Sequence, residues 1–137
     1  MTAAELLASD FATLPDLIRA HAAEQPDKVA LAEADGELDY ASLDALVDRV
    51  AAALQRDGVQ QGDAVAIVAA ASIDYVAIFL GALRAGCVAT PLAPSGTPDS
   101  IVAMIADCAA PITFVDAEAA SALSGHHIPG KLVHLKS

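Results

Sequence analysis

The chain has 137 residues, of which 55% are hydrophobic and 18% charged, and its mean hydropathy is +0.51. This composition excludes a disordered polymer, because the chain has enough apolar side chains to offset the entropy lost on ordering. Seven Lys and Arg residues against 18 Asp and Glu residues give a formal net charge of −11. We therefore expect no nucleic-acid partner and no binding to an anionic membrane surface.

The two cysteines, Cys87 and Cys108, lack CxxC spacing, which excludes a disulfide scaffold and a cysteine-based zinc knuckle. No basic stretch followed by an apolar run opens the chain, and this favours a cytoplasmic protein. Residues 1–12 are weakly patterned and are expected to form a leader, so that one structural unit covers residues 13–137.

Capping residues and apolar spacing predict the order of helices and strands. In the first half we expect a helix capped by Thr13 and ending before Pro26, then strands at 29–34 and 38–40 around an Asp35-Gly36 turn, and then a helix at 42–57 ended by Gly58. Next we expect a strand at 65–68, a helix at 73–84 ended by Gly86, and a strand at 87–90 ended by Pro91. The last part should form a helix capped by Thr97, a strand at 112–115, a short helix at 116–123 and a final edge strand at 131–135.

The second half of this order alternates strands with helices over short turns. Such alternation is typical of right-handed crossovers, so the predicted fold is α/β, an open and mostly parallel sheet with helices on both faces, preceded by a small N-terminal β-hairpin. The apolar run from Ala64 to Leu83 has the length of a membrane span. Asp74 near its middle would cost about 2.5–3.5 kcal/mol in a bilayer. We therefore interpret this run as a buried strand followed by a helix.

Two glycine-containing segments have the outline of phosphate sites but lack the required chemistry. Gly81 to Gly86 has the glycine spacing of a Walker A loop, yet Cys87 and Val88 stand where Lys and Ser or Thr are needed. We interpret Gly81 as a point of close helix packing and Gly86 as a helix stop. Residues 95–97 precede a helix N-terminus, but no cation lies nearby in sequence, and a turn followed by a capped helix is favoured.

Other candidate groups are incomplete. His126, His127 and His134 with Cys108 have no compact zinc-ligand spacing, and we assign no metal site. Cys87 is interpreted as a small apolar filler of a buried strand. Asp116 ends a strand at the edge where such folds bind ligands, but the acidic cluster and lysine of a phospho-acceptor site are missing. No residue of the chain is assigned a catalytic or cofactor-binding role.

Three motifs follow one another in the middle of the chain. They are LDYASL at residues 38–43, GVQQGDAVA at 58–66 and LRAGCVATPLAP at 83–94. In this order they resemble the adenylate-forming (AMP-binding) enzymes, in particular the acyl- and aryl-CoA synthetases. Asp39 departs from the Thr or Ser usual in the first motif, and Ala93 from the Asn or Asp common in the third. The residues with expected structural roles in these motifs are Tyr40, Leu43, Gly58, Gly62, Asp63, Gly86 and Pro91.

The resemblance implies the N-terminal subdomain of an ATP-dependent, AMP-forming carboxylic acid–CoA ligase. ATP, Mg²⁺ and CoA are implied for the parent enzyme only, because its phosphate-binding loop and lysine-bearing C-terminal domain would follow this segment. We expect the isolated chain to be inactive. The loops at 70–74 and 93–97 are expected to face the side of the acid-binding pocket.

The implied partners are the downstream subdomains of the same polypeptide and, in the parent enzyme, the carboxylic acid substrate. The high mean hydropathy predicts an exposed apolar face, with self-association of the isolated chain. Two alternatives stay open. One is a fragment of a peptide-synthetase adenylation domain, and the other is a self-contained α/β module that binds a partner or ligand without catalysis.

Overall fold

The computed structural model describes residues 1–135, so the last two residues of the predicted 13–137 unit lie outside the described residues. The helices are α1 (Ala3–Ala8), α2 (Leu14–Glu24), α3 (Tyr40–Arg56), α4 (Ile73–Arg84), α5 (Pro98–Asp107) and α6 (Ala117–Ala122). The strands are β1 (Val29–Glu33), β2 (Gly36–Asp39), β3 (Ala64–Val68), β4 (Val88–Leu92), β5 (Ile112–Val115) and β6 (Lys131–His134).

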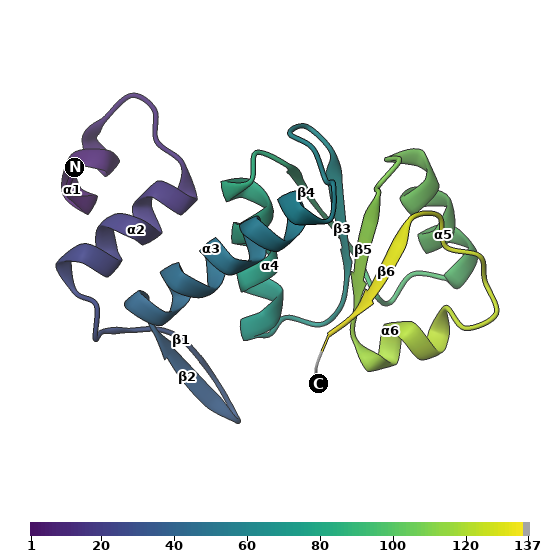
Figure 1. Cartoon of the computed structure of the whole chain (residues 1–137). Coiled ribbons are helices and arrows are strands. Elements are labelled where there is room, and N and C mark those ends of the chain that lie inside the picture. Colours follow the sequence, from purple (N-terminus) through teal and green to yellow (C-terminus); the bar gives the residue numbers. More distant parts are fainter. Residues whose placement is uncertain (136–137) are drawn as a thin grey trace.

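Four parallel strands form the main sheet, in the order β4-β3-β5-β6. Helices α3 and α4 lie on one side of this sheet and α5 and α6 on the other (Figure 1). Strands β1 and β2 form a separate antiparallel hairpin. The predicted fold class is confirmed, and the run at 64–83 is the predicted strand and helix. Within residues 1–135 no helix has the length and apolar character needed to cross a membrane.

Strand β3 is the centre of the core, and residues 65–68 of it are fully buried. Its side chains alternate between the two faces of the sheet, so each face needs its own cover of helices. The cluster on the α3–α4 side includes Leu54, Val65, Ile67 and Ile78, and the cluster on the α5–α6 side includes Ala66, Val68, Ile101 and Ile105.

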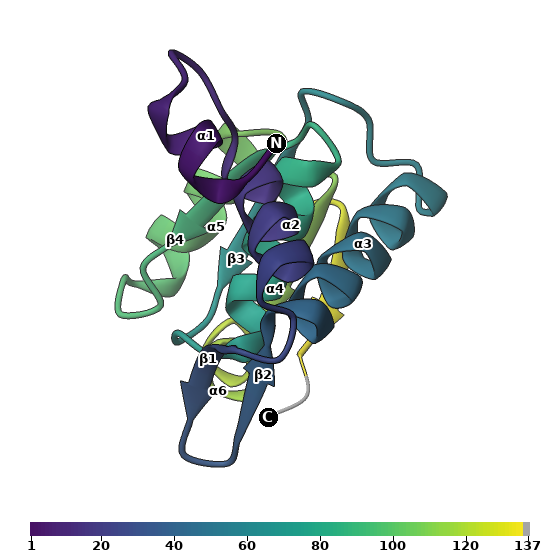
Figure 2. The ribbon, with the colours of Figure 1, turned by 90° about the vertical axis from the view of Figure 1, so that its left-hand side faces the viewer.

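The N-terminal segment adds a third layer outside α3 and α4 (Figure 2). Thr13 caps α2 as predicted, and its hydroxyl oxygen accepts a hydrogen bond from the Asp16 N–H at 3.2 Å. Helix α1, which Thr2 caps, lies inside the segment predicted as a leader and has no counterpart in the sequence prediction. The hairpin turn lies at residues 34–35, one position before the predicted Asp35-Gly36, because Gly36 already pairs with Glu33.

The prediction that Pro91 ends a strand is wrong. Strand β4 continues through Pro91 to Leu92, and Pro91 pairs with Ile67 of β3. A proline has no N–H to donate, but β4 is an edge strand with β3 as its only neighbour among the described strands. The missing donor is therefore tolerated at this position.

Gly81 lets α3 and α4 approach each other closely, as predicted. A Cβ atom added at Gly81 would lie 2.6 Å from the Cβ of Val50 and 3.4 Å from the backbone nitrogen of Ala51. Real Cβ atoms do not approach a branched side chain this closely, so one helix would have to move away. Because α3 and α4 together cover one side of β3, this contact sets the thickness of that layer.

A single arginine ties three helices together. The Arg84 side chain of α4 is 12% exposed, and its guanidinium lies 2.8 Å from an Asp44 carboxylate oxygen and 3.1 Å from one of Asp48, both in α3. It also donates a hydrogen bond of 2.7 Å to the carbonyl of Pro15 in α2. Arg19 of α2 contacts the same Asp48 oxygen at 2.7 Å. The planar guanidinium is suited to this set of partners, because it presents donors in several directions.

We predict that Gly81→Ala lowers the free energy of unfolding by about 1–3 kcal/mol, through overpacking against Val50. Urea denaturation measures this loss. In the double variant Val50→Ala/Gly81→Ala the added methyl has room, so the two substitutions should cost less together than the sum of their separate effects. Gly36→Ala is the matched control, because a Cβ there meets nothing within 4 Å. Equal losses for Gly81→Ala and Gly36→Ala would contradict the close approach.

We predict that Arg84→Met destabilises the chain by about 3 kcal/mol, because it leaves Asp44 and Asp48 facing each other with one partner fewer. Arg84→Lys should lower the stability by less, since an ammonium keeps the positive charge but reaches fewer acceptors. Thermal and urea unfolding measure both effects. Arg49→Met is the control, because the exposed Arg49 of the same helix α3 has no ion pair within residues 1–135. A similar loss in the control would disprove a special role for Arg84.

Candidate functional site

The carboxyl ends of the parallel strands meet at one edge of the sheet, where α/β folds commonly bind ligands. The loop after β3 and the loop after β4 come together there and enclose a hollow of about 250 Å³, lined by Ala70, Pro94, Ser95, Asp116, Glu118, Ala119 and Ala122. A second hollow of about 220 Å³ shares Ala70 and Asp116 and reaches the hairpin residues Glu33 and Asp35. The structure thus brings together the two loops singled out in the sequence, 70–74 and 93–97.

Asp116 fixes the geometry of this edge. One of its carboxylate oxygens accepts a hydrogen bond of 2.8 Å from the Ala119 N–H and caps α6, while the other accepts one of 2.9 Å from the Ala70 N–H. The second bond spans 46 residues of sequence and ties the loop after β3 to the end of β5. Asp116 is therefore a positioning residue, with both oxygens occupied by backbone donors.

The charge of the edge does not fit a triphosphate. The residues that line the two hollows include the carboxylates of Glu33, Asp35, Asp74, Asp116 and Glu118, and none of them is Lys or Arg. Carboxylates repel phosphate oxygens, and stabilisation of a transferring phosphate needs cations or aimed donors. Within residues 1–135 no three His, Cys, Asp or Glu side chains are grouped as a metal site. We therefore derive no ATP chemistry from these residues.

The segments with a phosphate-site outline have the structural roles predicted for them. Gly81 lies inside α4, and Gly86 follows it with φ of +79°, a left-handed conformation that glycine adopts without strain. In the turn after β4, the Gly96 N–H donates to the Ala93 carbonyl at 3.1 Å. The Thr97 hydroxyl oxygen then accepts from the Ser100 N–H at 3.3 Å and caps α5.

Among the described residues, the cysteine and histidine side chains belong to no group of three potential metal ligands. Cys87 is 6% exposed, and burial, with a smaller contribution from Asp63, raises the pKa of its thiol. Its sulfur lies 3.6 Å from the Gln60 carbonyl. A buried thiol with a raised pKa is a poor nucleophile, in agreement with its interpretation as a core filler. The predicted strand position is wrong, because Cys87 lies in the core just before β4, which begins at Val88. His126 lies 3.4 Å from Asp99, and both side chains are at the surface.

The seven motif residues lie in turns, at element ends and in the core. Leu43 is buried in α3, and Tyr40 begins this helix with its ring centroid 4.9 Å from that of His21. Gly58 and Gly62 have φ of +85° and +88°. Between Gly62 and β3, Asp63 accepts a hydrogen bond of 2.8 Å from the Gln60 N–H. Gly86 ends α4 and Pro91 lies in β4, as described above.

The position of Asp39 in the structure explains why an Asp can replace the Thr or Ser that is usual in the first motif. It is the N-cap of α3, and its carboxylate accepts a hydrogen bond of 2.8 Å from the Ser42 N–H. This bond lowers the pKa of Asp39 below its ordinary value. Asp, Ser and Thr all serve as N-caps, so the Asp in place of the usual Thr or Ser preserves the function of the position.

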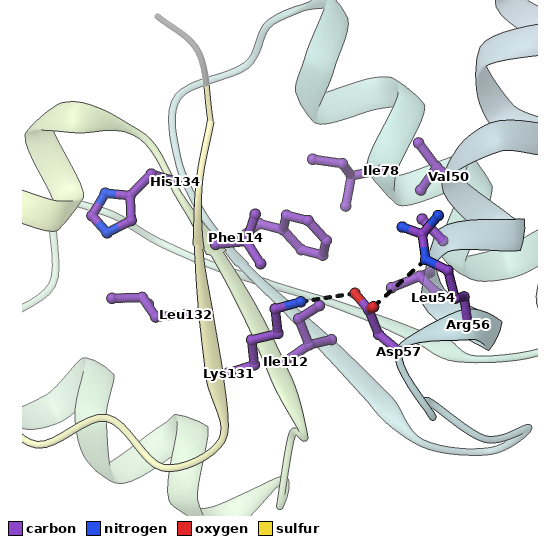
Figure 3. Close-up of a pocket in the computed structure, with 12 residues that line it drawn as sticks. Val50, Leu54, Arg56, Asp57, Ile78, Ile112, Phe114, Lys131, Leu132 and His134 are labelled. Atoms are coloured by element: carbon purple, nitrogen blue, oxygen red, sulfur yellow. Dashed lines mark hydrogen bonds and ion pairs between the residues drawn. The ribbon is translucent and has the colours of Figure 1, made fainter.

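A larger hollow lies away from the carboxyl edge, between the end of α3 and strands β5 and β6. It has a volume of about 450 Å³ and a mostly apolar lining. Figure 3 shows the side chains of Ile78, Ile112 and Phe114 on its inner side and a line of charged groups, Lys131, Asp57 and Arg56, at one end. We call this hollow the β6 groove.

The comparison with protein families identifies the chain. The family model described as "AMP-binding enzyme" matches residues 18–135. The chain belongs to this family. The resemblance inferred from the three motifs is therefore confirmed.

Two relatives support this membership, and one solved structure shows the same fold. The chain is 38% identical over 114 residues to hybrid PKS-NRPS synthetase 1 of Dothistroma septosporum. This alignment covers 81% of the chain and 3% of the relative. It is 31% identical over 121 residues to naringenin synthase of Pestalotiopsis fici, covering 88% of the chain and 4% of the relative. A fatty acyl CoA synthetase structure from Mycobacterium tuberculosis superimposes with a TM-score of 0.81 at 23% identity, over 88% of the chain and 26% of that protein. The chain thus spans a small part of the proteins that it matches.

Sequence reasoning missed one feature of the site and one contact of the helix layer. The hydrogen bond from Ala70 to Asp116 joins residues 46 positions apart, and no local pattern predicts such a contact. The role of Arg84 was also missed, although this residue occupies the Lys or Arg position of the LRAG motif. A cation in the last turn of an otherwise buried helix was the available signal, because a charge there needs a partner.

We predict that Asp116→Ala destabilises the chain by about 1–2 kcal/mol, because α6 loses its cap and the loop after β3 loses its anchor. Asp116→Asn should cost less, since its single amide oxygen still accepts one of the two bonds. Hydrogen exchange of the Ala70 and Ala119 amides, with urea denaturation, measures the effect. Glu118→Ala is the matched control, an exposed carboxylate in the first turn of the same helix. Unchanged exchange at Ala70 in Asp116→Ala would contradict the anchoring role.

Proposed function

We propose that the chain is the N-terminal scaffold of an ATP-dependent, AMP-forming carboxylic acid–CoA ligase. In this reaction the acid and ATP give an acyl-adenylate and pyrophosphate, and a thiol then takes the acyl group. The family match over residues 18–135 supports the reaction class. The observation that supports a scaffold role is that the described residues lining the carboxyl edge include five carboxylates and no Lys or Arg, so a triphosphate would have to be neutralised by other groups.

The contribution of this chain is to hold loops in place. Asp116 fixes the loop after β3, and the capped start of α5 fixes the loop after β4. We propose that these loops support the acid-binding side of the complete enzyme. Precise positioning of a reactant against ATP is worth several kcal/mol of barrier, and it requires rigid support behind the residues in contact.

The acyl acceptor has two candidates. Coenzyme A is our first proposal, because the LRAGCVATPLAP segment resembles bacterial acyl- and aryl-CoA synthetases. The thiol of a carrier protein is the second, and it is favoured by the 38% identity to hybrid PKS-NRPS synthetase 1. Both cysteines of the chain are free, which fits the reducing cytoplasm that we propose as its compartment.

We predict that the product of the complete gene catalyses acid-dependent exchange between pyrophosphate and ATP, whereas the 137-residue chain alone shows no exchange above buffer. The physical reason is that no Lys or Arg is among the described residues lining the acidic edge, where cations would be needed to hold the phosphates. Isotope exchange with a panel of carboxylic acids measures the activity, and omission of the acid is the control. Thioester formation with CoA or with a pantetheine-bearing carrier protein then separates the two acceptors.

Exchange by the 137-residue chain alone would disprove the scaffold role. A natural gene that ends at residue 137 would favour the alternative of a self-contained binding module. A complete product that forms acyl-adenylate but transfers the acyl group only to a carrier protein would favour the adenylation-domain candidate.

A further inference from the structure

We infer that the N-terminal segment of the chain is a self-association surface, through which two copies of this protein pair. The surface consists of the apolar side chains of Leu7, Phe11 and Leu14 and of a hollow between α1 and α2, and we call it the N-terminal patch. The inference does not rest on the proposed function. It gives the self-association expected from the mean hydropathy a defined place on the molecule.

Exposed large apolar side chains are concentrated in this segment. Of the seven such side chains among the described residues, four lie within residues 1–14, namely Met1, Leu7, Phe11 and Leu14. Phe11 is 83% exposed, and it is the only exposed aromatic side chain in residues 1–135. Single exposed apolar residues are common on protein surfaces, but several in one place indicate an interaction site. Figure 1 shows α1 at the opposite end of the molecule from β6, so the patch is separate from the β6 groove.

Hydrogen bonds hold the turn that carries Phe11. The Ser9 hydroxyl oxygen lies 2.7 Å from the Leu6 carbonyl and 3.0 Å from the Phe11 carbonyl, and it closes the turn after α1. The Glu24 carboxylate of α2 accepts a hydrogen bond of 3.3 Å from the Ala3 N–H and ties α1 to α2. A side chain on an ordered turn loses less entropy on binding than one on a mobile tail, and this favours association.

The patch also offers a place for an apolar side chain of another molecule. A hollow of about 430 Å³ lies between α1 and α2, and it is lined by Met1, Leu6, Asp16, Arg19, Ala20 and Ala23. Four of these six residues are apolar. A projecting aromatic ring and a largely apolar hollow on one surface make that surface complementary to itself. Two copies related by a two-fold axis can therefore each insert Phe11 into the hollow of the other.

The charges beside the hollow fit a second copy. The Arg19 side chain is 57% exposed, although it lies 2.7 Å from Asp48. The exposed Asp10 directly precedes Phe11, so insertion of Phe11 brings this carboxylate towards Arg19 of the other copy. Two chains with a net charge of −11 each repel one another, but charges farther apart than about 8 Å are largely screened at physiological ionic strength. The charges next to the contact therefore decide.

A lipid bilayer is a poorer partner for the same apolar side chains. Residues 1–16 carry three exposed carboxylates, those of Glu5, Asp10 and Asp16, and this segment contains no Lys or Arg. An anionic membrane surface attracts basic segments and repels an acidic one. A protein surface that supplies its own cation, as Arg19 does in a second copy, fits the patch better.

Sedimentation equilibrium of the 137-residue chain and of the complete gene product tests the inference. We expect a reversible dimer of each. Phe11→Ser should raise the dimer dissociation constant at least about tenfold, because central aromatic side chains carry much of the binding energy of such contacts. Val88→Ser is the matched control, an exposed apolar residue of β4 outside the patch, and it should leave the constant unchanged. If Phe11→Ser fails to fold, Leu7→Ser gives the same comparison.

A pair of charge substitutions tests the contact between Asp10 and Arg19. Asp10→Lys should weaken the dimer, because it places a second cation beside Arg19 of the other copy. Asp107→Lys, at an exposed residue of α5, changes the net charge by the same amount and should not weaken it. Equal weakening by both substitutions would contradict the proposed contact, because the effect would then not depend on the patch.

Three results of the sedimentation experiment overturn the inference. The first is equal dissociation constants for Phe11→Ser and Val88→Ser. The second is loss of association in Val133→Ser but not in Phe11→Ser, because the copies would then meet at the β6 groove. The third is a complete gene product that stays monomeric at all concentrations, because the patch would then be covered within one chain.

Discussion

The structure depends on the need to bury strand β3 on both faces. Residues 65–68 of this strand have no exposed surface, and neither face can be left to water. The chain meets this constraint by sending successive crossovers to opposite sides, with α4 on one side and α5 and α6 on the other (Figure 1). Each pair of consecutive strands in the main sheet is joined by a helical crossover, so all four strands are parallel and their carboxyl ends form one edge. The candidate site lies at this edge for that reason.

The side that carries α3 and α4 is held together by two different interactions. Gly81 permits an approach that no larger residue would allow, and Arg84 joins α3 and α2 through Asp44, Asp48 and the Pro15 carbonyl. The first interaction is steric and the second is electrostatic, but both place the helices over the same half of the sheet. The uncovered half is the β6 groove. The apolar surface of the β6 groove therefore results from where α3 and α4 pack on the sheet.

In the proposed enzyme, the negative charge of this segment decides which tasks it can perform. An acidic segment cannot neutralise a triphosphate, but it can hold loops rigidly, since carboxylates such as Asp116 and Asp39 are good acceptors for backbone N–H groups. The net charge of −11 is therefore compatible with a scaffold role in a nucleotide-dependent enzyme. It would be difficult to reconcile with direct contact to the phosphates.

The sequence by itself determined the order of elements after residue 12, the α/β class and the family, because caps, glycine turns and apolar periods are local signals. Thr13, Thr97 and Gly86 have the predicted roles, and three motifs in order identified the relatives. Only the tertiary structure decided that Pro91 continues an edge strand, since strand order is a non-local property. The same holds for the Asp116–Ala70 bond, the partners of Arg84 and the β6 groove. Each of these joins segments distant in sequence, and their contacts arise only when the sheet and its helices assemble.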